Sequence, residues 1–285
     1  MKKTGIMTDS HSGILNEEAE RLGIKVLPMP FYIEEKVYRE GVDLSREEFY
    51  DMLRKGTDVS TSQPSLVEVA EMWKEMLKEY EEIVYIPLSS ALSGSCMAAT
   101  AMANEDEFAG KVFVVDNGRV ATPMHRSVLD AVEMTEKGYS AAEIKKILEE
   151  TREKMTIYIG LSTLEYLKKG GRISKTVAFA GGVLNIKPVV TVQDGVVALI
   201  GKARGSRHGN NLLVEKIREA GGIDFSLPVL LGYSGLSDTY LKKYVEDSRD
   251  IWQDKADSLD STLICSVIGT HTGPGVVAVA FFKKG

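Results

Sequence analysis

The sequence predicts an α/β protein of two domains, with a mainly parallel, Rossmann-like sheet in residues 1–161 and an α/β domain with antiparallel sheet in residues 162–285. Three observations support this. The chain has 285 residues, more than one hydrophobic core usually needs. Short apolar runs alternate with amphipathic segments through the first half, as in strands joined by helical crossovers. In the second half, glycine pairs such as Gly181-Gly182 and a hairpin signal replace that alternation.

The apolar runs of the first domain are short and bounded by turn residues, so we expect each to form a strand. They lie at residues 5–8, 24–33, 83–88, 112–116 and 157–161. Strands linked through helices pair in parallel, and parallel sheets place ligand sites beyond the carboxyl ends of their strands. The loops after Thr8, Leu88, Asp116 and Leu161 are therefore the first places where we expect a site.

The helices between these strands have recognisable ends. Ser65 with Glu68, and Ser140 with Glu143, form the S-x-x-E pattern of a capping box, which predicts a helix start at each serine. Gly138 is expected to end the helix that precedes the second box, because glycine adopts the left-handed conformation common at that position.

The second domain begins its regular structure with a hairpin. Asp194-Gly195 joins the apolar runs 186–192 and 196–200, and an Asp-Gly pair is a strong signal for a two-residue turn. We expect the remaining elements in this order: a helix at 210–218, a strand at 229–233, a helix at 238–250, and strands at 262–268 and 276–282.

The composition limits the kinds of partner. Hydrophobic residues make up 44% of the chain, charged residues 27%, and the net charge is -6, which favours neither nucleic acid nor an anionic membrane as partner. No segment approaches about 20 apolar residues, so we expect no stable membrane insertion. The N-terminus lacks the apolar stretch of a signal peptide, and Cys96 and Cys265 show no CxxC spacing. A reducing, cytoplasmic location without a metal site is expected.

Two segments rich in hydroxyl groups lead into predicted helices, at residues 60–65 and 87–95. Helix starts of this kind offer hydroxyl and backbone N–H donors to an anion, and the helix dipole favours one there. The first segment contains Thr61 and Ser62, and the second contains Ser93 and Gly94. The alternative is that these residues only cap helices or allow close packing, which is their commoner use.

A glycine-rich connection at residues 269–275, with His271 at its centre, follows a predicted strand and precedes another. It could expose backbone N–H groups and an imidazole, although a bulged hairpin is the simpler interpretation. Arg172 follows a predicted helix end and Arg204 follows the hairpin. Each guanidinium could pair with an anionic ligand or partner, and solvated surface charge is the alternative.

Motifs of catalysis are absent from the sequence. It contains no G-x-S-x-G, HExxH, Walker A or GxGxxG pattern. A serine-dependent acyl hydrolase or thioesterase using Ser93 would need a histidine base and an orienting carboxylate. The four histidines, His11, His125, His208 and His271, cannot be assigned to that role from the sequence, so hydrolysis stays open as an alternative.

Several segments, taken in order, resemble the DegV family over essentially the whole chain. They are residues 8–10, 61–65, 89–95, 166–174, 186–188 and 268–275. The sequence departs from the family pattern at residues 95–97, which read Ser-Cys-Met where the family commonly has Thr-Tyr-Gln, and at residues 116–117, which read Asp-Asn where Asp-Ser is common. These departures leave the shape of the pocket, and hence its chain selectivity, open.

The resemblance implies the two-domain DegV fold and a FakB-like role as the fatty-acid-binding subunit of a bacterial fatty acid kinase. A long-chain fatty acid such as palmitate would lie in a tunnel between the domains and be presented to the catalytic subunit of the kinase, with no cofactor and no catalytic residue in this chain. By position, the resemblance assigns carboxylate binding to Thr61, Ser62, Ser93, Gly94 and His271, and kinase docking near the mouth to Arg172 and Arg204. A scaffold protein that carries an incidental lipid is a third possibility.

Overall fold

The computed structural model describes residues 2–173 and 185–284, so the predicted glycine pair 181–182 and the end of segment 166–174 lie outside the described residues. The chain forms two compact units. The first comprises Met1–Leu44 and Thr61–Glu153, and the second comprises Ser45–Ser60 and Lys154–Gly285. The second unit thus begins at Lys154 rather than at residue 162, and it includes a short segment taken from the first half of the sequence.

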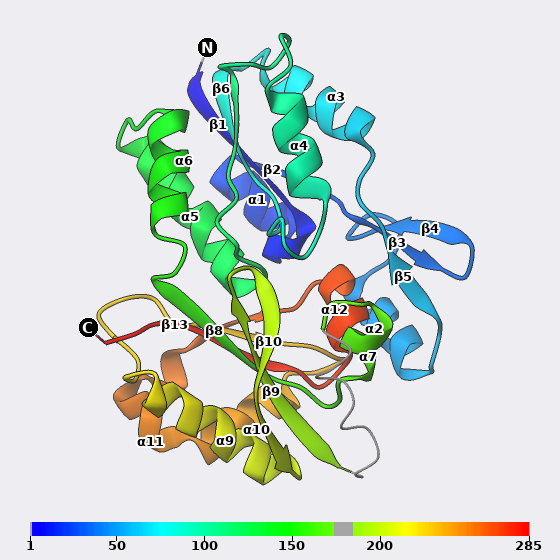
Figure 1. The fold of residues 1–285 in the computed structure, drawn as a ribbon, viewed down its shortest axis with the longest axis vertical. Coiled ribbons are helices and arrows are strands. Elements are labelled where there is room, and N and C mark those ends of the chain that lie inside the picture. The colour runs from blue at the N-terminus through cyan, green and yellow to red at the C-terminus, as the bar shows by residue number, and fades with distance from the viewer. Residues whose placement is uncertain (1, 174–184, 285) are drawn as a thin grey trace. The chain divides into compact units, whose positions relative to one another are not determined.

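A four-stranded parallel sheet forms the centre of the first unit (Figure 1). Its order is β2-β1-β6-β7, with β1 at Lys2–Asp9, β2 at Lys25–Leu27, β6 at Tyr80–Ile86 and β7 at Val112–Val114. All neighbouring strands pair in parallel, as the sequence predicted. Their carboxyl ends therefore meet at one edge of the sheet, and the loops that follow β1, β6 and β7 lie there.

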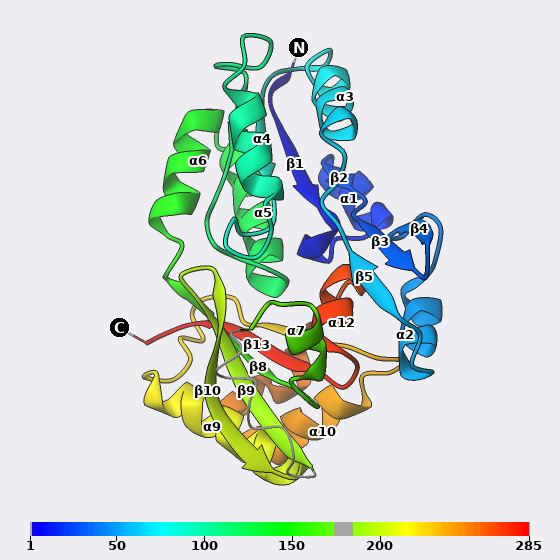
Figure 2. The same cartoon turned by 45° about the vertical axis from the view of Figure 1, so that its right-hand side comes forward.

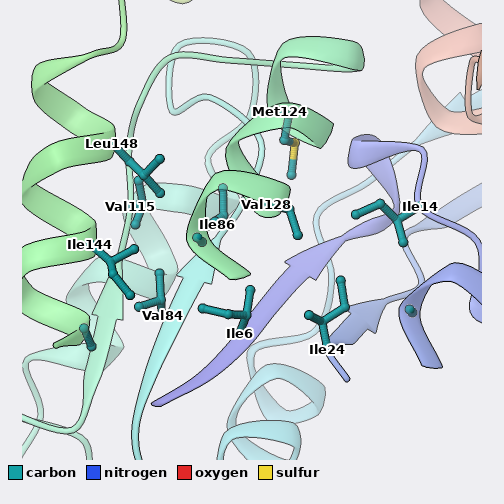
Figure 3. Close-up of a cluster of buried hydrophobic side chains, with 13 residues drawn as sticks. Ile6, Ile14, Ile24, Val84, Ile86, Val115, Met124, Val128, Ile144 and Leu148 are labelled. Atoms are coloured by element: carbon teal, nitrogen blue, oxygen red, sulfur yellow. The ribbon is translucent and has the colours of Figure 1, made fainter. Parts of the chain in front are cut away.

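Helices cover both faces of this sheet because successive strand side chains point to opposite sides. Val84 and Ile86 of β6 belong to a core shared with α1 (Asn16–Leu22), α5 (Thr122–Glu136) and α6 (Ala141–Glu150), as Figure 3 shows. On the other face, Tyr85 makes an edge contact with Trp73 of α3 (Leu66–Met76), and α4 (Ser95–Ala103) packs beside α3. Each fully buried aliphatic side chain contributes about 1.5–3 kcal/mol of transfer free energy.

The strand predicted at 24–33 is two strands. β2 ends at Leu27 and β3 runs over Pro30–Ile33, forming an antiparallel hairpin with β4 (Lys36–Arg39). The prediction failed because prolines at 28 and 30 cannot donate the hydrogen bonds of a continuous central strand. The short β5 (Val59–Thr61) follows α2 (Arg46–Arg54), where the chain returns to the first unit.

Only one of the two predicted capping boxes forms. Ser140 and Glu143 make both reciprocal bonds at the start of α6, which confirms that prediction. Ser65 caps α3 by accepting from the N–H of Val67, but no capping box is present there, and the carboxylate of Glu68 pairs instead with Arg39 at 2.8 Å.

A six-stranded, mostly antiparallel sheet forms the centre of the second unit (Figure 2). Its order is β10-β9-β8-β13-β11-β12, and the strands are β8 (Met155–Gly160), β9 (Ile186–Gln193), β10 (Val196–Arg204), β11 (Leu230–Tyr233), β12 (Asp260–Leu263) and β13 (Val277–Phe282). The hairpin at Asp194-Gly195 is confirmed, and both turn residues have positive φ, 51° and 78°. The assignment of 157–161 to the parallel sheet is wrong, because β8 pairs antiparallel with β9 and β13.

Helices lie on both faces of this sheet as well (Figure 2). One face packs against α9 (Ser206–Glu219), α10 (Thr239–Asp247) and α11 (Arg249–Trp252), followed by the 3-10 helix η2 (Gln253–Ser258). The predicted helix 238–250 is therefore broken at Ser248. The other face carries α7 (Glu165–Lys169) and α12 (Ser266–Thr272), which packs on α7 and α2.

The strand predicted at 262–268 is wrong in its second half. β12 ends at Leu263, and Ser266–Thr272 form helix α12, so His271 lies on a helix rather than in a hairpin turn. Apolar β-branched residues misled the prediction, because the buried face of a short helix also consists of them. The helix starts where Cys265 accepts from the N–H of Ile268, and it ends at Gly273, whose φ of 75° favours glycine.

Candidate functional site

The loop after β6 is fastened to the end of β1 by a buried carboxylate. Asp9, the last residue of β1, is fully buried. Its Oδ2 accepts from the N–H of Leu88 at 3.0 Å, and its Oδ1 accepts from the N–H of His11 at 2.9 Å and lies 2.7 Å from His11 Nδ1. A buried carboxylate requires such donors, because leaving it without partners is costly. In the sequence, Asp9 directly follows the predicted strand 5–8 and lies in segment 8–10 of the family resemblance, without a role assigned to it.

A second carboxylate holds the same loop from the side of β7. Asp116 follows β7 and accepts from both the N–H and the hydroxyl of Ser90, at 3.2 and 2.5 Å. The N–H of Ser89 donates to the carbonyl of Arg119 at 3.3 Å. The start of the loop is thus bonded to residues that follow the strands on either side of β6, which fixes where Ser93 stands.

Ser93 lies just before α4, but it is not the cap residue of that helix. The cap residue is Gly94, which makes no side-chain capping bond. Ser93 Oγ is partly buried, lies 3.0 Å from the Oγ of Ser95 and accepts from the N–H of Ser95 at 3.3 Å. The hydroxyl groups of Ser93 and Ser95 therefore form a small cluster at the amino end of α4, where an anion is favoured.

Thr61 and Ser62 lie at the end of β5, ahead of α3. Both are partly buried, and Ser62 Oγ donates to the carbonyl of Gln63 at 3.1 Å and approaches the hydroxyl of Tyr32 at 3.5 Å. The cap of α3 is Ser65 and not either of these residues. Neither Thr61 nor Ser62 therefore caps α3, while the bond from Ser62 to the carbonyl of Gln63 fits the other part of the alternative, that these residues turn the chain.

Gln63 brings the two hydroxyl-bearing segments together. Its side-chain amide lies against the Cα of Gly94, where an added Cβ atom would overlap Gln63 Nε2. Only glycine leaves room for this approach. Residues 61–63 and 93–94 are therefore neighbours within the first unit, and no local pattern in the sequence indicates that Gln63 links them.

His271 and Arg172 form a separate group in the second unit. His271 is partly buried on α12, and its imidazole lies against the Cα of Gly170, where a Cβ atom would overlap Nδ1. The carbonyl of Gly170 accepts from Nη1 of the exposed Arg172 at 2.5 Å. The end of α7 thus places an imidazole and a guanidinium beside the same glycine.

Arg204 is not joined to that group by any described contact. It is the last residue of β10, it is exposed, and its backbone pairs with Ile186. Across residues 2–173 and 185–284, no hydrogen bond or ion pair of its side chain links it to Arg172 or His271. Its predicted role stays a prediction.

Nucleophilic catalysis finds little support in the described geometry. No histidine of the described part of the chain is hydrogen-bonded to Ser93, while His11 is held by Asp9 and His125 by Glu18 at 3.1 Å. Desolvation, with a smaller contribution from Asp116, raises the pKa of the buried Cys96 thiol to about 12, so this cysteine stays protonated at neutral pH. The thiol of Cys96 is therefore not an activated nucleophile.

The described residues form neither a cluster of metal ligands nor a helix that could span a membrane. Those residues contain no group of three or more His, Cys, Asp or Glu side chains placed to hold a metal ion. They also contain no helix long and apolar enough to cross a membrane.

A family model described as "Uncharacterised protein, DegV family" matches residues 3–284. A DegV domain-containing protein of Caldanaerobacter subterraneus is 32% identical over 287 residues, with 100% of both chains covered. A DegV domain-containing protein of Deinococcus radiodurans is 32% identical over 281 residues, with 96% of each chain covered. The match therefore extends over both units.

Solved structures with the same fold include proteins described by what they bind. A DegV family protein from Thermus thermophilus, described for fatty acid binding, has a TM-score of 0.85 and 28% identity, covering 99% of this chain and 100% of that one. DegV from Bacillus subtilis, described as a fatty acid binding protein, has a TM-score of 0.79 and 26% identity, with 100% of both chains covered.

Proposed function

Because the chain belongs to the DegV family, we propose that it binds a long-chain fatty acid in a tunnel between its two units and presents the carboxylate to the catalytic subunit of a fatty acid kinase. The juxtaposition of residues 61–63 with residues 93–94 supports this proposal most directly, since it brings two hydroxyl-bearing segments together at a helix start. The fatty-acid-binding proteins of the same fold support the choice of ligand.

The acyl chain supplies most of the affinity in this proposal. A chain of about 16 carbons loses roughly 0.8 kcal/mol per buried methylene, or about 10 kcal/mol before the costs of association. A suitable wall exists in the second unit, where apolar side chains on the α7 and α12 face remain only partly buried. They are Leu164, Val192, Val197, Leu199, Leu230, Ile268 and Phe282.

The hydroxyl groups set the direction of the lipid. Hydrogen bonds to a carboxylate contribute about 1.5–3 kcal/mol each, and a carboxylate buried without them is strongly disfavoured. Thr61, Ser62 and Ser93, with the N–H of Gly94, are the donors we assign, and His271 is assigned to the same end of the ligand. Neutral donors leave the carboxylate oxygen more nucleophilic than an intimate ion pair would, which suits attack on the γ-phosphorus of ATP with ADP as the leaving group.

Docking of the kinase is assigned to the exposed guanidinium groups. Arg172 and Arg204 are exposed, and neither pairs with a carboxylate in the part of the chain that the structure describes. Exposed cations of this kind speed association with an acidic surface more than they add affinity. We place the complex in the cytoplasm, where ATP is available and where free thiols such as Cys96 and Cys265 persist.

A kinase assay tests the proposal. Delipidated protein is reloaded with palmitate and incubated with a fatty acid kinase catalytic subunit and ATP, and acyl phosphate is trapped as its hydroxamate. We expect acyl hydroxamate only when this protein, the lipid and the kinase are all present. At low protein concentration, we expect the Arg172→Ala variant to give acyl phosphate more slowly than the wild type. Acyl hydroxamate formed at the same rate without this protein would refute the proposed presentation.

A further inference from the structure

A small cavity lies in the second unit where β8 ends and β9 begins, below the first turns of α9 and α10. Its volume is about 140 Å³. Apolar side chains form most of its wall, among them Leu161, Val189, Leu213 and Val277. Leu213 and Val277 belong to the core on the α9 and α10 face of the sheet, the face opposite to α7 and α12. We refer to it as the α9 cavity.

Two glycines allow close packing in the wall of the α9 cavity. A Cβ atom at Gly209 would come within 2.9 Å of the Cβ of Lys187, and a Cβ atom at Gly275 would come within 2.5 Å of Ser162 Oγ. Both glycines line the cavity, and both approaches are shorter than normal van der Waals contact. A side chain at either position would therefore have to displace Lys187 or Ser162, two other lining residues.

One wall carries a lysine for which the described residues supply no anionic partner. Lys187 is partly buried, and its Nζ lies 3.5 Å from the carbonyl oxygen of Ser162, another lining residue. No carboxylate of residues 2–173 or 185–284 forms an ion pair with it. Partial burial of an ammonium group without a counter-charge is unfavourable, and an anion in the cavity would relieve it.

A carboxylate bonded to two of the lining residues is already compensated. Asp247 accepts from Lys243 Nζ at 3.3 Å and from Asn210 Nδ2 at 2.9 Å, and both donors line the α9 cavity. The positive charge of Lys187 therefore stays in excess at this site. Ser206, the first residue of the 14-residue helix α9, adds a hydroxyl group and the free N–H groups of a helix start.

We infer that the α9 cavity binds a small organic anion, a carboxylate with a short apolar tail. A cavity of about 150 Å³ holds a molecule of six carbons such as benzene, so a chain of about four to six carbons fits and a long-chain fatty acid does not. A carboxylate suits the donors better than a phosphate does, because one ammonium and a few hydroxyl and N–H groups cannot satisfy four phosphate oxygens. The site is separate from the residues assigned to the long-chain ligand.

Nuclear magnetic resonance titration of the whole chain with hexanoate tests this inference, with hexan-1-ol and inorganic phosphate as comparison probes. We expect saturable shifts of the Gly209 and Gly275 amides with hexanoate, and at least tenfold weaker binding of both other probes. Equal binding of hexan-1-ol would show that no charge is recognised. Equal binding of phosphate would show that no apolar tail is recognised. If hexanoate caused no shifts at these two amides of the wild-type protein, the inference would be overturned.

Variants distinguish this site from that of the long-chain ligand. Lys187→Gln is expected to weaken hexanoate binding about tenfold, and Lys187→Arg to retain most of it. Lys242→Gln is the matched control, since Lys242 lies next to Lys243 on α10 and pairs with Asp238 at 3.0 Å. The Thr61→Ala, Ser93→Ala double variant should leave the hexanoate shifts unchanged. Shifts that vanish in that double variant, or survive Lys187→Gln at full affinity, would contradict the inference.

Discussion

The side-chain amide of Gln63 rests on the Cα of Gly94, and this contact holds the end of β5 against the start of α4. Because Gln63 is exposed and its amide is the far end of a flexible side chain, the contact organises the hydroxyl groups more than it stabilises the fold.

Gly94→Ala tests the contact directly. The new methyl group must displace Gln63, so we expect palmitate binding to weaken about tenfold while the free energy of unfolding changes by less than about 1 kcal/mol. Adding Gln63→Ala to the same chain removes the overlap and should recover part of the affinity. Fluorescent fatty acid displacement measures the first quantity and urea denaturation the second, and unaltered affinity in Gly94→Ala would argue against a role for this approach.

Asp9 is expected to be the most sensitive polar residue of the first unit. Asp9→Asn keeps the size of the side chain but turns a donor toward at least one of the N–H groups that Asp9 accepts from, so we expect a loss of about 1–3 kcal/mol in the free energy of unfolding. Asp106→Asn, a change on the exposed surface, serves as the control and should change stability by less than about 0.5 kcal/mol. Equal urea midpoints for the two variants would contradict the structural role given to Asp9.

The raised pKa of Cys96 predicts a dependence of stability on alkaline pH. The thiol pKa is about 12 in the folded chain and near 9.0 when exposed, so the unfolded chain releases this proton first. The contribution is complete below pH 9 and is lost as pH rises toward 12, by at most about 1.4 kcal/mol per pH unit. Denaturation of the wild type and of Cys96→Ala between these pH values should show a steeper decline for the wild type. If the stability of both proteins declined equally with pH, burial would not raise the pKa of the Cys96 thiol.

Gly170 should tolerate no side chain. In Gly170→Ala the methyl group would occupy the space of the His271 imidazole, and we expect a loss of about 1–3 kcal/mol in stability together with weaker fatty acid binding. Gly160→Ala is a fair comparison, because a Cβ atom there meets its neighbours at an ordinary 3.8 Å. Thermal unfolding of both variants checks the prediction. It fails if Gly170→Ala unfolds at the same temperature as the wild type.

The sequence predicted the parallel sheet of the first unit and the β9–β10 hairpin, because both depend on local patterns: apolar runs bounded by turn residues, and an Asp-Gly pair. It assigned β8 to the wrong sheet, because which strands pair depends on tertiary packing. It predicted a strand where α12 forms, because tertiary packing also decides between helix and strand in a short apolar run. For the site, Thr61, Ser62, Ser93 and Gly94 were predicted from hydroxyl-rich helix starts, and their role in binding stays a prediction. Gln63, which joins them, and Lys187, which lines a separate cavity, carry no local signal, since their roles come from residues distant in the chain.

Native mass spectrometry of the purified protein tests the central claim most directly, because it weighs the bound lipid. We expect the wild type to carry one fatty acid of about 16 carbons, and the Thr61→Ala, Ser93→Ala variant to lose most of it at equal folding, since two carboxylate donors at about 1.5 kcal/mol each are removed. Ser237→Ala with Thr239→Ala removes another pair of neighbouring hydroxyl groups and should leave the lipid in place. A wild type without lipid after incubation with palmitate, or a Thr61→Ala, Ser93→Ala variant that retains it fully, would contradict the account.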